Sequence, residues 1–189
     1  MTLPINWPER VVIVLVSLAV SIGLIGLLSG FFAGRDQAGV TAATGPGQQF
    51  RDLGHAHLAP GQPRPAYDSD PPTSGAHVPD PVTRDRSQLN NDQLLQALVA
   101  GNVVIMYGTP NPPGGLTNLA HKIASPFTPA LAAAGQAIIL ARRPATKGLI
   151  GLAWARMVRV SSPDDPRLHD FASFWLGRGA KQRYTTGSQ

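Results

Sequence analysis

Histidines are the side chains of this chain best suited to chemistry, because the sequence contains no cysteine. The lack of thiols excludes disulfides, thiolate metal sites and a cysteine nucleophile. Five histidines remain, His55, His57, His77, His121 and His169. The first three lie in loop-rich sequence, and imidazoles that converge from loops bind Cu(II) or Zn(II). His55, His57 and His77 are therefore a candidate copper or zinc site; the alternative is that they are polar loop residues without a ligand.

Other catalytic patterns are missing from the sequence. It contains no nucleophile elbow with a Ser/His/Asp set, no P-loop and no dinucleotide-binding fingerprint. The aspartates of the first half lie in turn-like sequence, where Asp is favoured because its side chain bonds to the nearby backbone. The residues alone therefore predict no catalytic side chain, no cofactor other than the candidate metal, and no enzyme.

The elements that would position these histidines form a small α+β domain over residues 67–179. Asn91 is expected to cap a helix that Gly101 ends. About three or more strands flanked by helices are expected. The strands cover residues 103–107, 137–141 and 151–160, and the helices cover residues 92–100, 116–124, 126–134 and 162–176.

An apolar run over residues 11–32 predicts a single transmembrane helix. At ~1.5 Å per residue such a run spans a hydrocarbon core of ~30 Å, and it is longer than the apolar part of a cleaved signal peptide, which is the alternative. Small residues recur along one face of this helix, at Ala19, Gly23, Gly26 and Gly30. They predict close packing against a transmembrane helix of another subunit; the alternative is that glycine is simply common in membrane helices.

The rest of the chain divides into three segments of different composition. Residues 1–10 form a short N-terminal segment, residues 33–66 a Pro/Gly-rich linker and residues 180–189 a polar tail. The formal net charge is +5, and the excess of Lys and Arg follows Ala100. A basic surface can face anionic lipid, an acidic partner or solvent. No nucleic-acid partner is expected, because no binding motif accompanies the charge.

Several segments resemble a bacterial membrane-anchored family known as domain of unknown function 3105. The most specific stretch runs from Tyr67 to His77, and its motif residues are Tyr67, Pro71, Pro72, Thr73, Ser74, Gly75 and His77. The strand at Gly101–Tyr107, the Ala-Trp-Ala around Trp154 and the segment Phe171–Gly179 also resemble the family. The likeness covers residues 50–179.

The resemblance implies one N-terminal membrane helix and an outward-facing domain, on the extracytoplasmic (periplasmic) side of a bacterial cell membrane. It also implies a metal or catalytic site built on the family's His-Ser-Leu-Glu-His-Gly motif. In this chain that motif reads Gln-Ala-Leu-Val-Ala-Gly over residues 96–101, so both histidines and the glutamate are absent. Of the implied site His57 and His77 remain, with His55 as an additional candidate.

Two functions are consistent with these residues. The first is a non-catalytic accessory subunit of a larger membrane complex, such as a photosynthetic or respiratory electron-transfer complex, in contact with the lipid bilayer. The second is an extracytoplasmic module that binds copper or zinc through the loop histidines. A hydrolase or other enzyme is disfavoured, because the motif that would transfer protons is lost.

Overall fold

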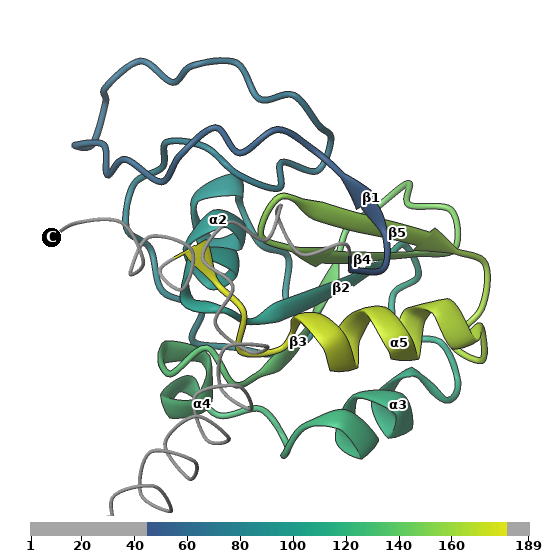
Figure 1. Cartoon of the computed structure of the whole chain (residues 1–189). Helices are drawn as coiled ribbons and strands as arrows, with labels where there is room; N and C mark the ends of the chain where they lie inside the picture. Colours follow the sequence, from purple (N-terminus) through teal and green to yellow (C-terminus); the bar gives the residue numbers. More distant parts are fainter. Residues whose placement is uncertain (1–44, 181–189) are drawn as a thin grey trace, which may run out of the picture. The chain divides into compact units, whose positions relative to one another are not determined.

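A five-stranded mixed sheet forms the centre of the domain in the computed structural model, which describes residues 45–180 (Figure 1). Its strands are β1 (Gln48–Gln49), β2 (Val103–Tyr107), β3 (Ile138–Arg142), β4 (Leu149–Ala153) and β5 (Arg156–Val160), in the spatial order β1-β5-β4-β2-β3. Strands β2 and β3 are parallel, and the other neighbours are antiparallel. The predicted α+β class is therefore correct for this part of the chain.

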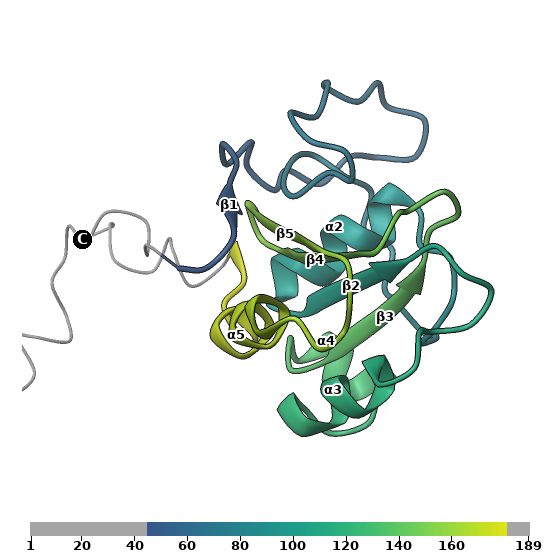
Figure 2. The same ribbon diagram turned by 90° about the vertical axis from the view of Figure 1, so that its right-hand side faces the viewer.

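Helices cover both faces of the sheet (Figure 2). They are α2 (Asn91–Ala100), α3 (Leu116–Ile123), α4 (Pro129–Ala133) and α5 (Pro166–Trp175). On one face Ile150 and Leu152 pack in the core with the leucines of α2. On the other face Gly151 lies against Leu168 and Phe171 of α5. The alternation of side chains along β4 thus separates two apolar layers.

Local signals explain why α2 forms where it was predicted. The Asn90 side chain accepts a hydrogen bond from the Gln93 amide at 2.8 Å, and the Gln93 side chain accepts one from the Asn90 amide at 3.3 Å. This reciprocal capping box places the N-cap at Asn90, one residue before the predicted Asn91. Gly101 ends the helix in the left-handed conformation, with φ 113°.

The single strand predicted over residues 151–160 is in fact a hairpin of β4 and β5. Trp154 and Ala155 form its two-residue turn, and Ala155 adopts φ 55°. Neither residue is a usual turn former, so the sequence carries no turn signal here. The turn is held from outside, because the Ala155 amide donates to the Thr73 carbonyl at 2.9 Å.

The transmembrane part of the predicted fold class is corrected. Among residues 45–180 no helix is long and apolar enough to cross a bilayer. The longest helices, α2 and α5, have 10 residues each. At ~1.5 Å per residue, such a helix reaches about half of a ~30 Å hydrocarbon core. The predicted span 11–32 and its small-residue face lie outside the described residues.

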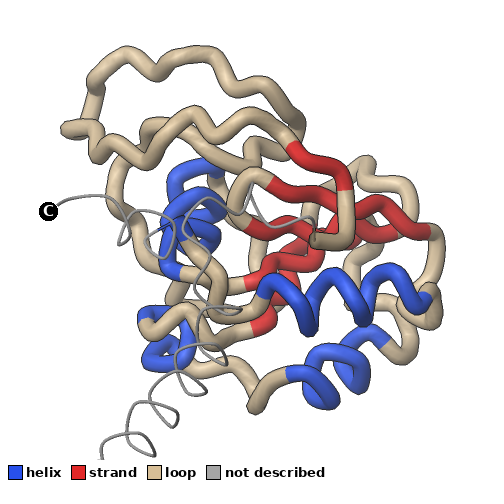
Figure 3. The backbone as a smooth tube through the Cα atoms, in the orientation of Figure 1, coloured by secondary structure: helices blue, strands red, loops and turns tan. Residues whose placement is uncertain are grey.

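A long irregular segment between β1 and α2 contains the predicted motif (Figure 3). It includes part of the stretch predicted as a linker, and Gln48–Gln49 of that stretch pair with β5. Further along, the Asp85 carboxylate accepts from the Leu140 amide at 2.9 Å, and Arg86 donates to the Leu140 carbonyl at 2.8 Å. These bonds cover the outer edge of β3, which protects the sheet from edge-to-edge association.

Ala155→Val is expected to lower the free energy of unfolding by about 3 kcal/mol, because a β-branched residue is strained at positive φ and this site is fully packed. Ala155 is 1% exposed. The matched control is Ala145→Val, at an exposed position with φ 66°. It should cost only about 1 kcal/mol, from backbone strain alone. Equal losses for the two variants in denaturant unfolding would contradict the buried turn.

Candidate functional site

His57 and His77 are brought together by pairing between two loop segments. The Gly75 amide donates to the Gly54 carbonyl at 2.9 Å, the His77 amide to Ala56 at 3.1 Å, and the Leu58 amide to His77 at 2.9 Å. These bonds form a parallel bridge that places His57 beside His77. Their ring centroids are 5.5 Å apart and the ring planes meet at 76°. Two of the three histidines predicted for the metal site are therefore neighbours.

The two rings differ in environment. His77 is fully buried, whereas His57 is exposed. The Nδ1 atom of His77 lies 3.0 Å from the Gly75 carbonyl oxygen, which accepts its N–H. In the neutral ring this donation leaves the lone pair on Nε2. The site thus presents one oriented, buried imidazole next to one accessible imidazole.

Gln96 of α2 completes this cluster, and the sequence did not identify it as a site residue. Its Oε1 atom lies 3.3 Å from Nε2 of His77. The amide nitrogen would fit the same position, since the two ends of the side chain are isosteric. The available signal was that Gln96 stands where the resembling family has the first histidine of its motif. We call His57, His77 and Gln96 the imidazole cluster.

The other histidines lie elsewhere. The ring of His55 packs edge-on against Trp154, with centroids 6.2 Å apart. His121 is exposed on α3, and His169 is exposed on α5, where its Nδ1 lies 3.5 Å from the Asp170 carboxylate. Within residues 45–180 no three His, Asp or Glu side chains gather in a way that could hold a metal ion. The structure therefore joins His57 to His77 and does not join His55 to them.

Most of the predicted motif residues stabilise the loop around the cluster. Thr73 and Ser74 are fully buried. The Ser74 hydroxyl accepts from the Leu53 amide and donates to the Arg51 carbonyl, both at 3.0 Å. The Thr73 carbonyl binds the amide of Ala155 at the hairpin turn. These hydroxyl and backbone groups are engaged in holding loops together, so the motif carries structure rather than reactive groups.

Tyr67 supports the same loop. Its hydroxyl donates to the Ala76 carbonyl at 3.2 Å, and its ring covers Gly75, where an added Cβ would lie 2.9 Å from it. Burial raises the pKa of the Tyr67 phenol above its ordinary value of 10.0, with Asp92 adding to the shift and Arg64 opposing it. The phenol therefore stays protonated and remains a donor at neutral pH.

The segment 96–101 stands where the resemblance implies a His/Glu motif. Val99 is 3% exposed and belongs to the apolar core, and Ala100 carries no polar group. Gly101 instead contacts other backbone: its carbonyl accepts from the Gly177 amide at 2.8 Å. Residue 96 is the position of this segment whose side chain lies against His77.

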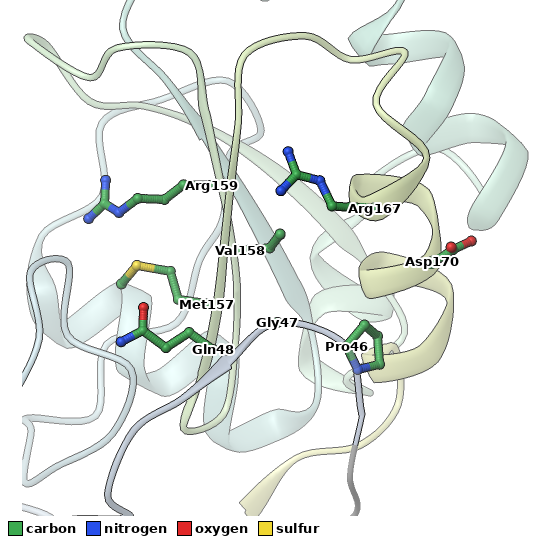
Figure 4. Close-up of a pocket in the computed structure, with 8 residues that line it drawn as sticks. All are labelled: Pro46, Gly47, Gln48, Met157, Val158, Arg159, Arg167 and Asp170. Atoms are coloured by element: carbon green, nitrogen blue, oxygen red, sulfur yellow. The ribbon is translucent and has the colours of Figure 1, made fainter.

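A separate cleft of about 340 Å³ lies between β5 and α5 (Figure 4). Val158 and Arg167 point into it from the two elements. Arg167 is paired with Asp165, at 2.7 Å between Nη2 and Oδ2. The side-chain hydrogen bond from Arg167 is the main reason that the pKa of Asp165 is lowered. This pair caps α5, since the Asp165 side chain also accepts from the Arg167 amide at 3.0 Å.

Comparisons with known proteins agree with the resemblance noted in the sequence. No curated protein and no solved structure matches the chain. The family model described as "Protein of unknown function (DUF3105)" matches residues 60–186. This match contains the motif loop, the imidazole-cluster residues His77 and Gln96, and the sheet from β2 to β5. The chain therefore belongs to the DUF3105 family.

Proposed function

We propose that this chain is a non-catalytic accessory subunit of a larger complex on the extracytoplasmic side of a bacterial membrane. The observation that carries the proposal is the segment 96–101, where core packing by Val99 and an alanine at position 100 replace groups able to transfer protons. A domain that keeps the family fold without those groups is suited to binding. Energy-transducing complexes, photosynthetic or respiratory, are the class we favour, because they contain many small accessory subunits.

An exposed proline-rich loop over residues 59–66 supports this proposal as the contact surface. Its conformation is restrained by Pro60, Pro63 and Pro65, whose rings restrict φ. Arg64 forms an ion pair with Asp92 of α2, which connects the loop to the body of the domain. A loop ordered in advance loses little conformational entropy when it meets a partner.

Photocrosslinking tests this surface in the native membrane. A photoreactive residue in place of Gln62 should crosslink to one partner protein, because position 62 is exposed in the loop that we propose as the contact surface. The same residue at Asn118, an exposed position of α3, is the matched control. The proposal fails if the chain, solubilised in mild detergent, migrates as a free monomer without co-purifying subunits. It also fails if the photoreactive residue at position 62 crosslinks to no protein.

The imidazole cluster supports a second candidate function, binding of copper or zinc. Two imidazoles on one tetrahedral metal ion, with metal–nitrogen distances of about 2.0 Å, place their ring centroids roughly 5 Å apart. The 5.5 Å between His57 and His77 is close to that separation. The oxygen of Gln96 is a weak third donor, so the site would hold metal more loosely than a three-histidine site.

His57→Ala is expected to weaken Cu(II) binding by at least tenfold in calorimetric titration, because one of two imidazole ligands is removed. The exposed His57 can be replaced without disturbing the core, unlike the buried His77. His169→Ala, at an exposed position on α5, is the control and should bind Cu(II) like the unchanged chain. Equal affinities for the His57 variant and the unchanged chain would exclude the site.

A further inference from the structure

A basic cavity of about 400 Å³ lies beside the turn between β3 and β4. Three cationic side chains line it: Arg143, Lys147 and Arg159. They come from both ends of the turn and from β5. Among the described residues that line the cavity, Asp70 is the one carboxylate. Figure 4 shows Arg159 pointing away from α5, on the side of β5 opposite Arg167. Arg159 lines both the cavity and the cleft in Figure 4, which share no other lining residue, and the cavity contains no residue of the imidazole cluster.

Arg143 begins a tight turn, and Lys147 directly follows it. The Thr146 amide donates to the Arg143 carbonyl at 3.2 Å and closes a four-residue turn. Pro144 occupies the second position of this turn, and Ala145 occupies the third with φ 66°, which is the type II pattern. The turn also packs on the end of β2, because a Cβ on Gly108 would lie 2.2 Å from the Thr146 carbonyl oxygen. The backbone beneath the cations is therefore ordered before any ligand arrives.

Asp70, which precedes Pro71 of the motif, orients both arginines. Its carboxylate accepts from Nη2 of Arg143 at 2.5 Å, and its carbonyl accepts from Nη2 of Arg159 at 2.7 Å. The Asp70 side chain is 83% exposed, whereas that of Arg143 is 32% exposed. Within the part of the chain that the structure describes, one solvent-exposed carboxylate and three cations line the cavity, which gives it an excess of positive charge.

We infer that this cavity binds the phosphoryl group of a small organic phosphate or of a lipid headgroup. Guanidinium groups form paired hydrogen bonds with phosphate oxygens, and an ammonium adds a mobile point charge. Cavities of roughly 300 Å³ or more hold small organic ligands. Pro71, Pro144 and Ile150 provide an apolar wall for the part of the ligand beyond its phosphoryl group.

Calorimetric titration of the full chain with inorganic phosphate, at constant ionic strength, tests this inference. Arg159→Gln should weaken binding at least tenfold, because it removes an oriented guanidinium. Lys122→Gln makes the same change of charge at an exposed position of α3 and should leave binding unchanged. An unchanged melting temperature verifies that the Arg159 variant is folded.

Two organic probes distinguish the sources of the phosphoryl group. Tighter binding of glycerol 3-phosphate, a monoester, identifies a soluble organic phosphate. Tighter binding of glycerophosphoglycerol, a diester, identifies a lipid headgroup. The inference is overturned if none of the three probes binds. It is also overturned if Lys122→Gln weakens binding as much as Arg159→Gln, because the attraction would then come from net charge alone.

Discussion

Gly179→Ala is expected to lower the free energy of unfolding by about 2–4 kcal/mol, because the new methyl group would overlap backbone that has no room to move. A Cβ at Gly179 would lie 2.2 Å from the Val99 carbonyl oxygen and 2.6 Å from the Gly101 amide nitrogen. The chain after α5 thus crosses the end of α2 backbone to backbone. Gly135 also packs against the end of α2, since a Cβ at this position would lie 2.0 Å from the Ala100 carbonyl oxygen.

The matched control for this prediction is Gly114→Ala. Apart from Gly114 itself and its two chain neighbours, no atom of the described residues lies within 4 Å of a Cβ built there, so the substitution should be neutral or slightly stabilising. Denaturant unfolding of the two variants, followed by circular dichroism, measures the difference. Equal stabilities would contradict the close crossing of α2 with the C-terminal segment.

Gln96→His is expected to tighten Cu(II) and Zn(II) binding by about 100-fold, equivalent to roughly 2.7 kcal/mol. The Gln96 side chain already reaches Nε2 of His77, at 3.3 Å from its Oε1. An imidazole in its place adds a third nitrogen ligand to the His57 and His77 pair, and three-histidine sites hold zinc well. Residue 96 is half-buried on α2, so the larger ring has access to solvent.

Two controls separate a built site from a general effect of one more histidine. Gln48→His adds an imidazole at an exposed position of β1 and should not change metal affinity. Combining Gln96→His with His57→Ala should abolish the gain, because the added ring then lacks one of its partners. Calorimetric titration with each metal measures all three variants. A gain of the same size from Gln48→His would rule out cooperation with His57 and His77.

The match to the family over residues 60–186 changes how its motif is understood. The sequence marked Thr73, Ser74 and His77 as motif residues, and of these three it predicted a metal ligand only at His77. In the structure the Thr73 carbonyl bonds to the turn of the β4–β5 hairpin, and the Ser74 hydroxyl bonds to the backbone of Arg51 and Leu53. Of the three residues, His77 alone faces another imidazole. Hydroxyls that bond to backbone look the same in a sequence as hydroxyls that await a ligand, since only their surroundings differ.

Elements with local signals were predictable from the sequence. The capping box at Asn90 and Gln93 and the left-handed glycine at 101 delimit α2, and the apolar run Val103–Tyr107 is β2. These features depend on residues a few positions apart, whose bonding needs no distant partner. The α+β class follows from such elements, because each must bury an apolar face on another.

Other features were decided only by tertiary contacts. The turn at Ala155 has no turn-forming residue and is stabilised by Thr73, and β1 is a polar pair of residues that becomes a strand only because β5 lies beside it. The meeting of His57 and His77 with Gln96 joins two loops to a helix. The spacing of the histidines predicted which of them are candidate ligands, but it could not predict that Gln96 lies beside them. The distances between such side chains are set by how the whole chain packs, which no local pattern records.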